Sequence, residues 1–167
     1  MTSADPLKIE SIDLAGLQRL AELMVHSLPP PLVIGLVGTL GAGKTSLVQS
    51  IARAAEIDDA DVTSPTFTLL QTHQGNIRIH HLDAYRIADE DEFLELGVQE
   101  LFEDQSAWTV VEWADRVEQV LPRETLWITI LINQESDKRA IQFDGDAEIT
   151  GAIRQIVNDR SFAGDKD

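Results

Sequence analysis

The sequence predicts an α/β fold with a mainly parallel central sheet and antiparallel edge strands. Strand-like and helix-like segments alternate along the chain, as they do in α/β proteins. Two continuous apolar runs, at residues 32–37 and 107–113, are typical of strands buried on both faces. With 167 residues, 43% of them hydrophobic and 25% charged, the chain has the size and composition of one globular domain. We expect this domain to span residues 1–160 and the polar residues 161–167 to form a frayed tail.

The N-terminal part predicts a short strand followed by a helix. Residues 7–12 form the candidate strand. Apolar residues then recur at helical spacing from Leu14 to Met24, and either Ser11 or Asp13 is available as the N-cap. Three consecutive prolines at 29–31 end this helix, because proline cannot continue the hydrogen-bond pattern.

The next segments predict a buried strand, a helix and a hairpin. The run LVIGLV at 32–37 is the strand, and residues 45–55 form the helix, with Leu47, Val48 and Ile51 on one side. The pair Gly75-Asn76 lies between two strand-like segments, 69–73 and 77–83, and is typical of a hairpin turn. We therefore predict an antiparallel hairpin at this point.

The C-terminal half predicts one helix, three strands and a closing helix. The helix spans residues 93–102, and the apolar run 107–113 is a further buried strand. Residues 126–132 and 140–143 are expected to form an antiparallel pair. Apolar residues at helical spacing between Ile149 and Val157 predict the last helix.

Composition excludes several classes of function. The chain has no cysteine, which excludes disulfides, thiolate metal sites and cysteine nucleophiles and suits a reducing cytosol. Its formal net charge of −16 repels phosphate backbones, so we expect no binding of nucleic acid by the chain alone. No apolar stretch is long enough to span a bilayer, and residues 1–10 lack the features of a secretion signal. We expect a cytoplasmic protein without membrane contact.

The strongest motif is a phosphate-binding loop. Residues 38–45 satisfy G-x-x-x-x-G-K-[ST] in full, after an apolar strand and at the start of a helix. The backbone N–H groups of such a loop surround a phosphate, the lysine reaches the β- and γ-phosphates, and the hydroxyl that follows binds Mg²⁺. The predicted nucleotide contacts are Gly38, Thr39, Leu40, Gly41, Ala42, Gly43, Lys44, Thr45 and Ser46.

A phosphate-binding loop needs an acid to hold magnesium, and two acids end predicted strands. Glu112 follows the more apolar strand and is the more typical magnesium acid. Asp83 ends a more polar strand and is suited to bind magnesium through water or to activate the attacking water. Residues 63–67 (TSPTF) stand where nucleotide hydrolases place a hydroxyl-bearing switch, although an ordinary Ser-Pro turn is an equal alternative.

Two further features have simpler alternatives. His80 and His81 are adjacent, and neighbouring strand residues face opposite sides, so the pair is poorly suited to bind one metal ion. The stretch 89–104 contains eight acids and no lysine or arginine. It is either a solvated helix face or a docking surface for a basic partner.

In order along the chain, the motifs LGAGKT, SPTF at 64–67, HLDAYR at 81–86 and EW at 112–113 resemble the bacterial TsaE (YjeE) family. This family consists of small ATPases required to make threonylcarbamoyladenosine in tRNA, and the resemblance extends from about Leu14 to Arg139. It implies a P-loop NTPase-like three-layer sandwich, ATP or ADP and Mg²⁺ as ligands, and a complex with the TsaD and TsaB subunits.

The resemblance also implies individual roles. Thr45 and Glu112 would be magnesium ligands, Asp83 would be required for hydrolysis, and Thr66 would belong to the switch segment. Trp113 would lie near the nucleotide, and Arg139, or alternatively Lys138, is the nearest match to a basic residue that contacts nucleotide in the family. We therefore expect an ATPase that is slow alone and stimulated by its partners.

Two other nucleotide-dependent functions are weaker alternatives. A P-loop small-molecule or nucleotide kinase gathers arginines in a lid over the transferred phosphoryl group, yet no lysine or arginine occurs between Arg86 and Arg116. A GTPase needs Asp-x-x-Gly after the loop and Asn-Lys-x-Asp for guanine. The chain has Asp-x-x-Gly only at 13–16, ahead of the loop, and Asn133 is followed by glutamine.

Overall fold

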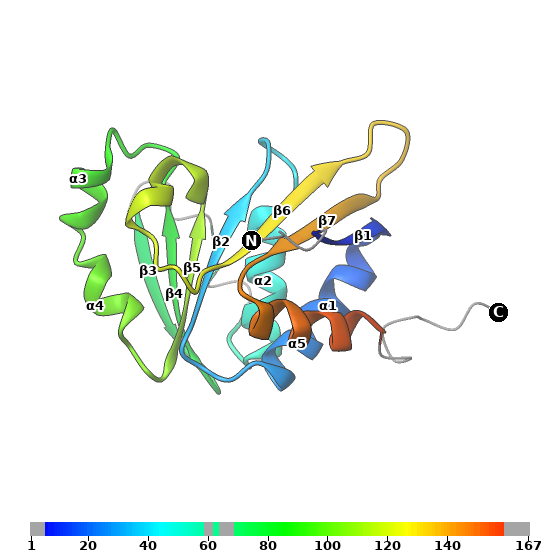
Figure 1. Ribbon diagram of the computed structural model, residues 1–167, viewed down its shortest axis with the longest axis horizontal. Helices are drawn as coiled ribbons and strands as arrows, with labels where there is room; N and C mark the ends of the chain where they lie inside the picture. The colour runs from blue at the N-terminus through cyan, green and yellow to red at the C-terminus, as the bar shows by residue number, and fades with distance from the viewer. Residues whose placement is uncertain (1–5, 59–61, 64–68, 159–167) are drawn as a thin grey trace.

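A seven-stranded sheet runs through the middle of the computed structural model, which describes residues 6–58, 62–63 and 69–158, and helices lie on both of its faces (Figure 1). The strand order is β1-β7-β6-β2-β5-β4-β3. The strands are β1 (Leu7–Ile12), β2 (Leu32–Val37), β3 (Leu70–Gln74), β4 (Arg78–Asp83), β5 (Ala107–Glu112), β6 (Leu126–Ile132) and β7 (Arg139–Asp144).

The centre of this sheet is parallel and its edges are antiparallel, as predicted. Strands β6, β2, β5 and β4 pair in parallel, whereas β3 pairs antiparallel with β4, and β7 pairs antiparallel with both β6 and β1. Parallel strands end at the same edge of a sheet, where open α/β sheets bind their ligands. The segments that follow β2, β4 and β5 are therefore brought together at one edge.

The helices form the outer two layers. Helices α1 (Leu14–Ser27), α2 (Lys44–Ala54) and α5 (Ala147–Asn158) pack on one face, where they share a core with β2 and β6. The two short helices α3 (Glu90–Leu94) and α4 (Val98–Phe102) cover the other face together with the 3-10 helix η2 (Ala114–Val120). Hydrophobic side chains close both layers, so the predicted three-layer arrangement is confirmed.

Most predicted elements agree with the structure to within a few residues. Asp13, rather than Ser11, caps α1, because its side chain accepts a hydrogen bond of 2.8 Å from the Gly16 N–H. The single helix predicted at 93–102 is wrong. Gly97 adopts a φ of +76°, which breaks the helix and starts α4 in a new direction. Helix η2 was not predicted, and the tail at 161–167 lies outside the described residues.

Within the part of the chain that the structure describes, no helix is long and apolar enough to cross a membrane.

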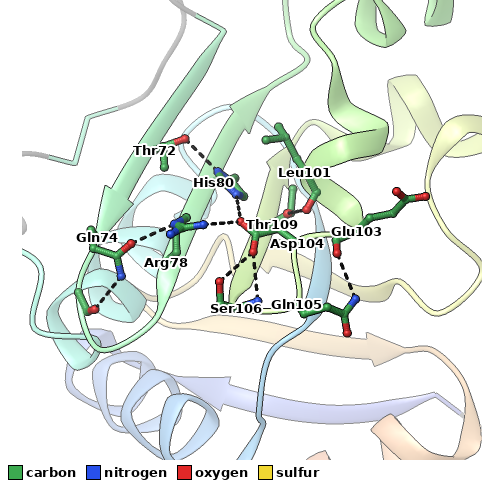
Figure 2. A network of polar contacts seen from close by, with 11 residues as sticks. Thr72, Gln74, Arg78, His80, Leu101, Glu103, Asp104, Gln105, Ser106 and Thr109 are labelled. Atoms are coloured by element: carbon green, nitrogen blue, oxygen red, sulfur yellow. Dashed lines mark hydrogen bonds and ion pairs between the residues drawn. The ribbon is translucent and has the colours of Figure 1, made fainter.

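A polar network joins the hairpin β3–β4 to the turn before β5 (Figure 2). Asp104 Oδ2 lies 2.9 Å from both Arg78 Nη1 and His80 Nε2, while its Oδ1 accepts hydrogen bonds from the backbone and hydroxyl of Ser106. On its other side, His80 Nδ1 lies 2.9 Å from Thr72 Oγ1. The hydrogen bond with His80, followed by those with Ser106 and Arg78, holds the pKa of Asp104 well below its usual range. Asp104 therefore belongs to the fold and not to the exposed acidic surface.

We expect Asp104→Asn to lower the melting temperature by roughly 3–6 °C near neutral pH, because the charge-assisted contacts of Oδ2 with Arg78 and His80 are lost. A carboxylate with a depressed pKa stabilises the fold above the ordinary pKa of the unfolded chain, and this contribution is lost progressively as the pH falls toward the folded pKa. The difference between wild type and variant should thus begin to shrink below about pH 5 and continue to shrink as the pH falls toward the depressed pKa of Asp104. Asp91→Asn, at an exposed site on α3, is the control. A difference in melting temperature between wild type and Asp104→Asn that does not change with pH would contradict this account.

Candidate functional site

The predicted phosphate-binding loop lies where β2 ends and α2 begins, at the carboxyl edge of the parallel strands. Gly43 precedes α2 with a φ of +113°, a conformation that favours glycine and turns the loop into the helix. The loop therefore brings its backbone N–H groups to the N-terminus of α2, where the helix dipole favours anions.

Lys44 is buried under the loop and an aromatic ring. Its ammonium group donates hydrogen bonds to the carbonyls of Gly38 (2.6 Å) and Thr39 (3.0 Å) and lies 4.0 Å from the centre of the Trp113 ring. Burial lowers the pKa of Lys44, although the nearby carboxylates of Glu112, Asp83 and Asp115 oppose this shift. The structure thus places a partly desolvated cation beside the loop, with acidic groups around it.

The two predicted acids lie side by side but have different partners. Asp83 and Glu112 are paired in register at the ends of β4 and β5, and both are buried. The Thr45 hydroxyl donates a 2.8 Å hydrogen bond to Glu112 Oε1. Asp83 Oδ1 accepts a 2.8 Å hydrogen bond from the Tyr85 N–H. Glu112 is thus joined to the hydroxyl that follows the loop lysine.

His81 lies on the opposite side of Glu112 from Thr45. Its Nε2 is 2.5 Å from Glu112 Oε2, and the histidine side chain is completely buried. His80 faces the other layer and takes part in the network of Figure 2. The two histidines therefore point to opposite faces of the sheet, as their positions in the strand predicted.

Aromatic side chains form one wall of the site. Trp113 has a φ of +56°, and its ring centre lies 4.8 Å from that of Tyr85, which is covered in turn by the Arg116 guanidinium at 5.2 Å. A cavity of about 440 Å³ lies beside these two aromatic rings. It is lined by the two rings, by Asp83 and Glu112, and by residues 40–46 apart from Ala42. Tyr85 was not singled out from the sequence, although it stands two residues after a strand-end acid inside a motif that was.

Arg139 braces the loop from outside. Its Nε donates a 2.9 Å hydrogen bond to the Ala42 carbonyl, and one Nη lies 3.4 Å from the Gly41 carbonyl. The same arginine and Ser46 line a second cavity of about 160 Å³, next to apolar residues at the start of α1. Arg139 thus meets the loop at the second cavity, whereas Ser46 lines both cavities.

The remaining predicted site residues are Leu40 and Thr66. Leu40 is 79% exposed at the tip of the loop. Thr66 and the rest of the segment 64–67 lie outside the described residues, so the switch remains a prediction.

The donor set suits a hard cation that also binds phosphate. Within the described ranges 6–58, 62–63 and 69–158, no group of three or more histidines and carboxylates forms a metal cage. Magnesium prefers oxygen ligands and is usually held by one or two protein groups together with waters and substrate phosphates. The Thr45 hydroxyl and the Glu112 carboxylate, already in contact, fit this share of the coordination.

The comparisons with known proteins agree on one family. A family model described as "Threonylcarbamoyl adenosine biosynthesis protein TsaE" matches residues 12–141, a range that includes the loop, both acids, Trp113 and Arg139. Proteins described as "tRNA threonylcarbamoyladenosine biosynthesis protein TsaE" from Treponema pallidum (strain Nichols) and Bacillus subtilis (strain 168) are 37% and 36% identical over 120 and 138 residues. These alignments cover 72% and 82% of this chain and 81% and 84% of the relatives.

A solved structure is similar over almost its entire length. The crystal structure of YdiB from Bacillus subtilis superposes with a TM-score of 0.74 at 27% sequence identity. The superposition covers 93% of this chain and 97% of that protein.

Proposed function

Since the chain belongs to the TsaE family, which takes part in tRNA threonylcarbamoyladenosine biosynthesis, we propose that it is the Mg²⁺-dependent ATP-hydrolysing component of that machinery. The main support for this proposal is the contact between Thr45 and Glu112 directly beside Lys44. A hydroxyl, a carboxylate and a buried cation at the N-terminus of a helix are the groups that magnesium and a nucleoside triphosphate require together.

Each group would then have a distinct task. The loop N–H groups bind the phosphates, and Lys44 exchanges its hydrogen bonds with the Gly38 and Thr39 carbonyls for phosphate oxygens. Thr45 and Glu112 would hold Mg²⁺, which neutralises charge on the phosphates when bound. Asp83, beside Glu112 at the end of the neighbouring strand, would orient a water molecule for hydrolysis. Trp113 and Tyr85 would shield this chemistry from solvent.

The second cavity suits the nucleoside end of ATP. It adjoins the loop through Gly41, Gly43 and Ser46, and its other lining residues include Ile12, Leu14, Leu17 and Arg139. Apolar side chains can pack against a base, while Arg139 supplies a cation at the edge. We therefore place adenine on the α1 side of the loop and the reacting phosphate on the β4–β5 side.

We propose TsaD and TsaB as partners that stimulate hydrolysis, in the cytoplasm, where tRNA is modified. The acidic surface of α3 and α4 is the proposed docking region. Besides Asp89, its exposed acids are Asp91, Glu95, Glu100 and Glu103. Two other acids of this stretch serve the local fold, because Asp89 caps α3 and Glu92 accepts a hydrogen bond from the Ala88 N–H. With a net charge of −16, the chain has no surface excess of cations for binding tRNA unaided.

The proposal predicts that ATP turnover is slow for the chain alone and rises severalfold or more with TsaD and TsaB together. Turnover is measured with each component omitted in turn, at low and high salt. Neutralising the four exposed acids of α3 and α4 to amides should weaken the stimulation and its salt dependence, because exposed charge pairs are screened. Nucleotide affinity should not change.

The matched control neutralises four exposed acids elsewhere: Glu22, Glu124, Glu135 and Glu148. An equal loss of stimulation in both variants would remove α3 and α4 as the docking region. Full activity of the chain alone, without any response to partners, would overturn the partner-stimulated ATPase and favour the kinase alternative.

A further inference from the structure

We propose that His81 is a positioning residue, which holds the Glu112 carboxylate in the orientation that magnesium binding requires. This inference rests on the proposed function of the loop. It adds a residue whose role is exerted through Glu112, and not through contact with nucleotide or metal.

The contacts of Glu112 leave its carboxylate little freedom to rotate. One oxygen, Oε1, accepts the hydrogen bond from the Thr45 hydroxyl at 2.8 Å, and the other, Oε2, lies 2.5 Å from His81 Nε2. The exposed fractions of the two side chains are 0% for His81 and 3% for Glu112. A buried carboxylate held at both oxygens presents the same face toward Thr45 in every molecule, which is the preorganisation that a metal ligand needs.

The sheet explains why His81 reaches Glu112. Strands β4 and β5 are parallel neighbours in which His81 pairs with Val110, and Asp83 pairs with Glu112. Alternate residues of a strand point to the same face, so His81 lies on the same side as Asp83 and Glu112, one step further from the end of the strand. From there His81 contacts the Glu112 carboxylate on the side of the sheet interior. The carboxyl edge of the sheet, where Glu112 ends its strand, stays open to the cavity beside the loop.

The unused nitrogen of His81 indicates which group donates. Among the described residues, His81 Nδ1 has no hydrogen-bond partner and is buried. A buried N–H without an acceptor costs about 1–3 kcal/mol, so the ring proton belongs on Nε2, where it is donated to Glu112. The other carboxylate oxygen, Oε1, then remains on the side of Thr45.

The test compares two substitutions of similar size. His81→Gln keeps an N–H donor at nearly the position of Nε2, whereas His81→Met removes it. Binding of ADP is measured by calorimetry in EDTA and over a series of Mg²⁺ concentrations. We expect His81→Met to need a Mg²⁺ concentration about tenfold higher, or more, to reach the same ADP affinity, while its ADP affinity in EDTA is unchanged. His81→Gln should need almost the same Mg²⁺ concentration as the wild type. His81→Asn, whose shorter amide does not reach Glu112, replaces His81→Met if that variant does not fold.

A direct measurement on the free protein accompanies the binding series. In ¹⁵N spectra of the histidine rings, the Nε2–H signal of His81 should be that of a hydrogen-bonded donor and should shift in Glu112→Gln. A Mg²⁺ requirement that is unchanged in His81→Met, or equal losses with and without Mg²⁺, would reduce His81 to a structural residue and overturn the inference. If the wild-type chain itself bound no nucleotide, the proposed function would fail, which is a different result from a failure confined to the His81 variants.

Discussion

Lys44→Ala is expected to weaken ATP binding by about 100-fold or more. The ammonium group is the cation closest to the loop carbonyls, and hydrogen bonds to charged groups contribute about 1.5–3 kcal/mol each. Two such bonds to phosphate correspond to at least two orders of magnitude in affinity. Because burial has already removed part of the hydration of Lys44, less desolvation remains to be overcome when a phosphate arrives.

Calorimetric titration with ATP and Mg²⁺ measures this effect, and thermal unfolding checks that the variant is folded. Lys8→Ala, which removes a lysine from the edge strand β1, is the control for the loss of one positive charge. Wild-type affinity in Lys44→Ala would refute the assignment of the loop.

A variant lacking Trp108 and Trp127 leaves Trp113 as the single tryptophan. The tryptophan emission of this variant should change on adding ADP and Mg²⁺, since Trp113 covers Lys44.

The second large effect separates the two acids. Glu112→Gln should raise the Mg²⁺ concentration needed for nucleotide binding by about tenfold or more, because an amide is a poorer ligand for a hard cation and the contact with Thr45 is altered. Asp83→Asn should bind nucleotide and Mg²⁺ almost normally, yet lose turnover by about 100-fold or more, as expected for a group that orients the attacking water.

Both variants are compared in the same two assays, nucleotide binding over a Mg²⁺ series and partner-stimulated ATP turnover. The amides preserve the size of each side chain, and the backbone contact of Ala84 N–H with the Glu112 carbonyl is unaffected by either change. If Asp83→Asn loses magnesium while Glu112→Gln keeps it, the two roles are exchanged. If both variants bind and hydrolyse ATP normally, neither acid belongs to the reaction.

Local patterns in the sequence were sufficient for most of the elements and for the loop. Continuous apolar runs predicted β2 and β5, the Gly75-Asn76 pair predicted the hairpin, and residues 38–45 predicted a turn from strand to helix. Such signals depend on residues close together in the chain, so they can be recognised without knowledge of the fold. The helix expected at 93–102 was wrong because apolar spacing does not show that Gly97 takes a left-handed conformation.

Only the tertiary structure decided which side chains meet. Thr45 and Glu112 are 67 residues apart, and Arg139 contacts a carbonyl 97 residues earlier, so no local pattern relates them. The sequence left Asp83 and Glu112 as alternatives and did not assign His81 or Tyr85 a role. It also counted Asp104 with the exposed acids, whereas its contacts turn it inward. The physical reason is that periodicity determines which residues share a face of one strand, while strand order and register determine which faces of different strands become neighbours.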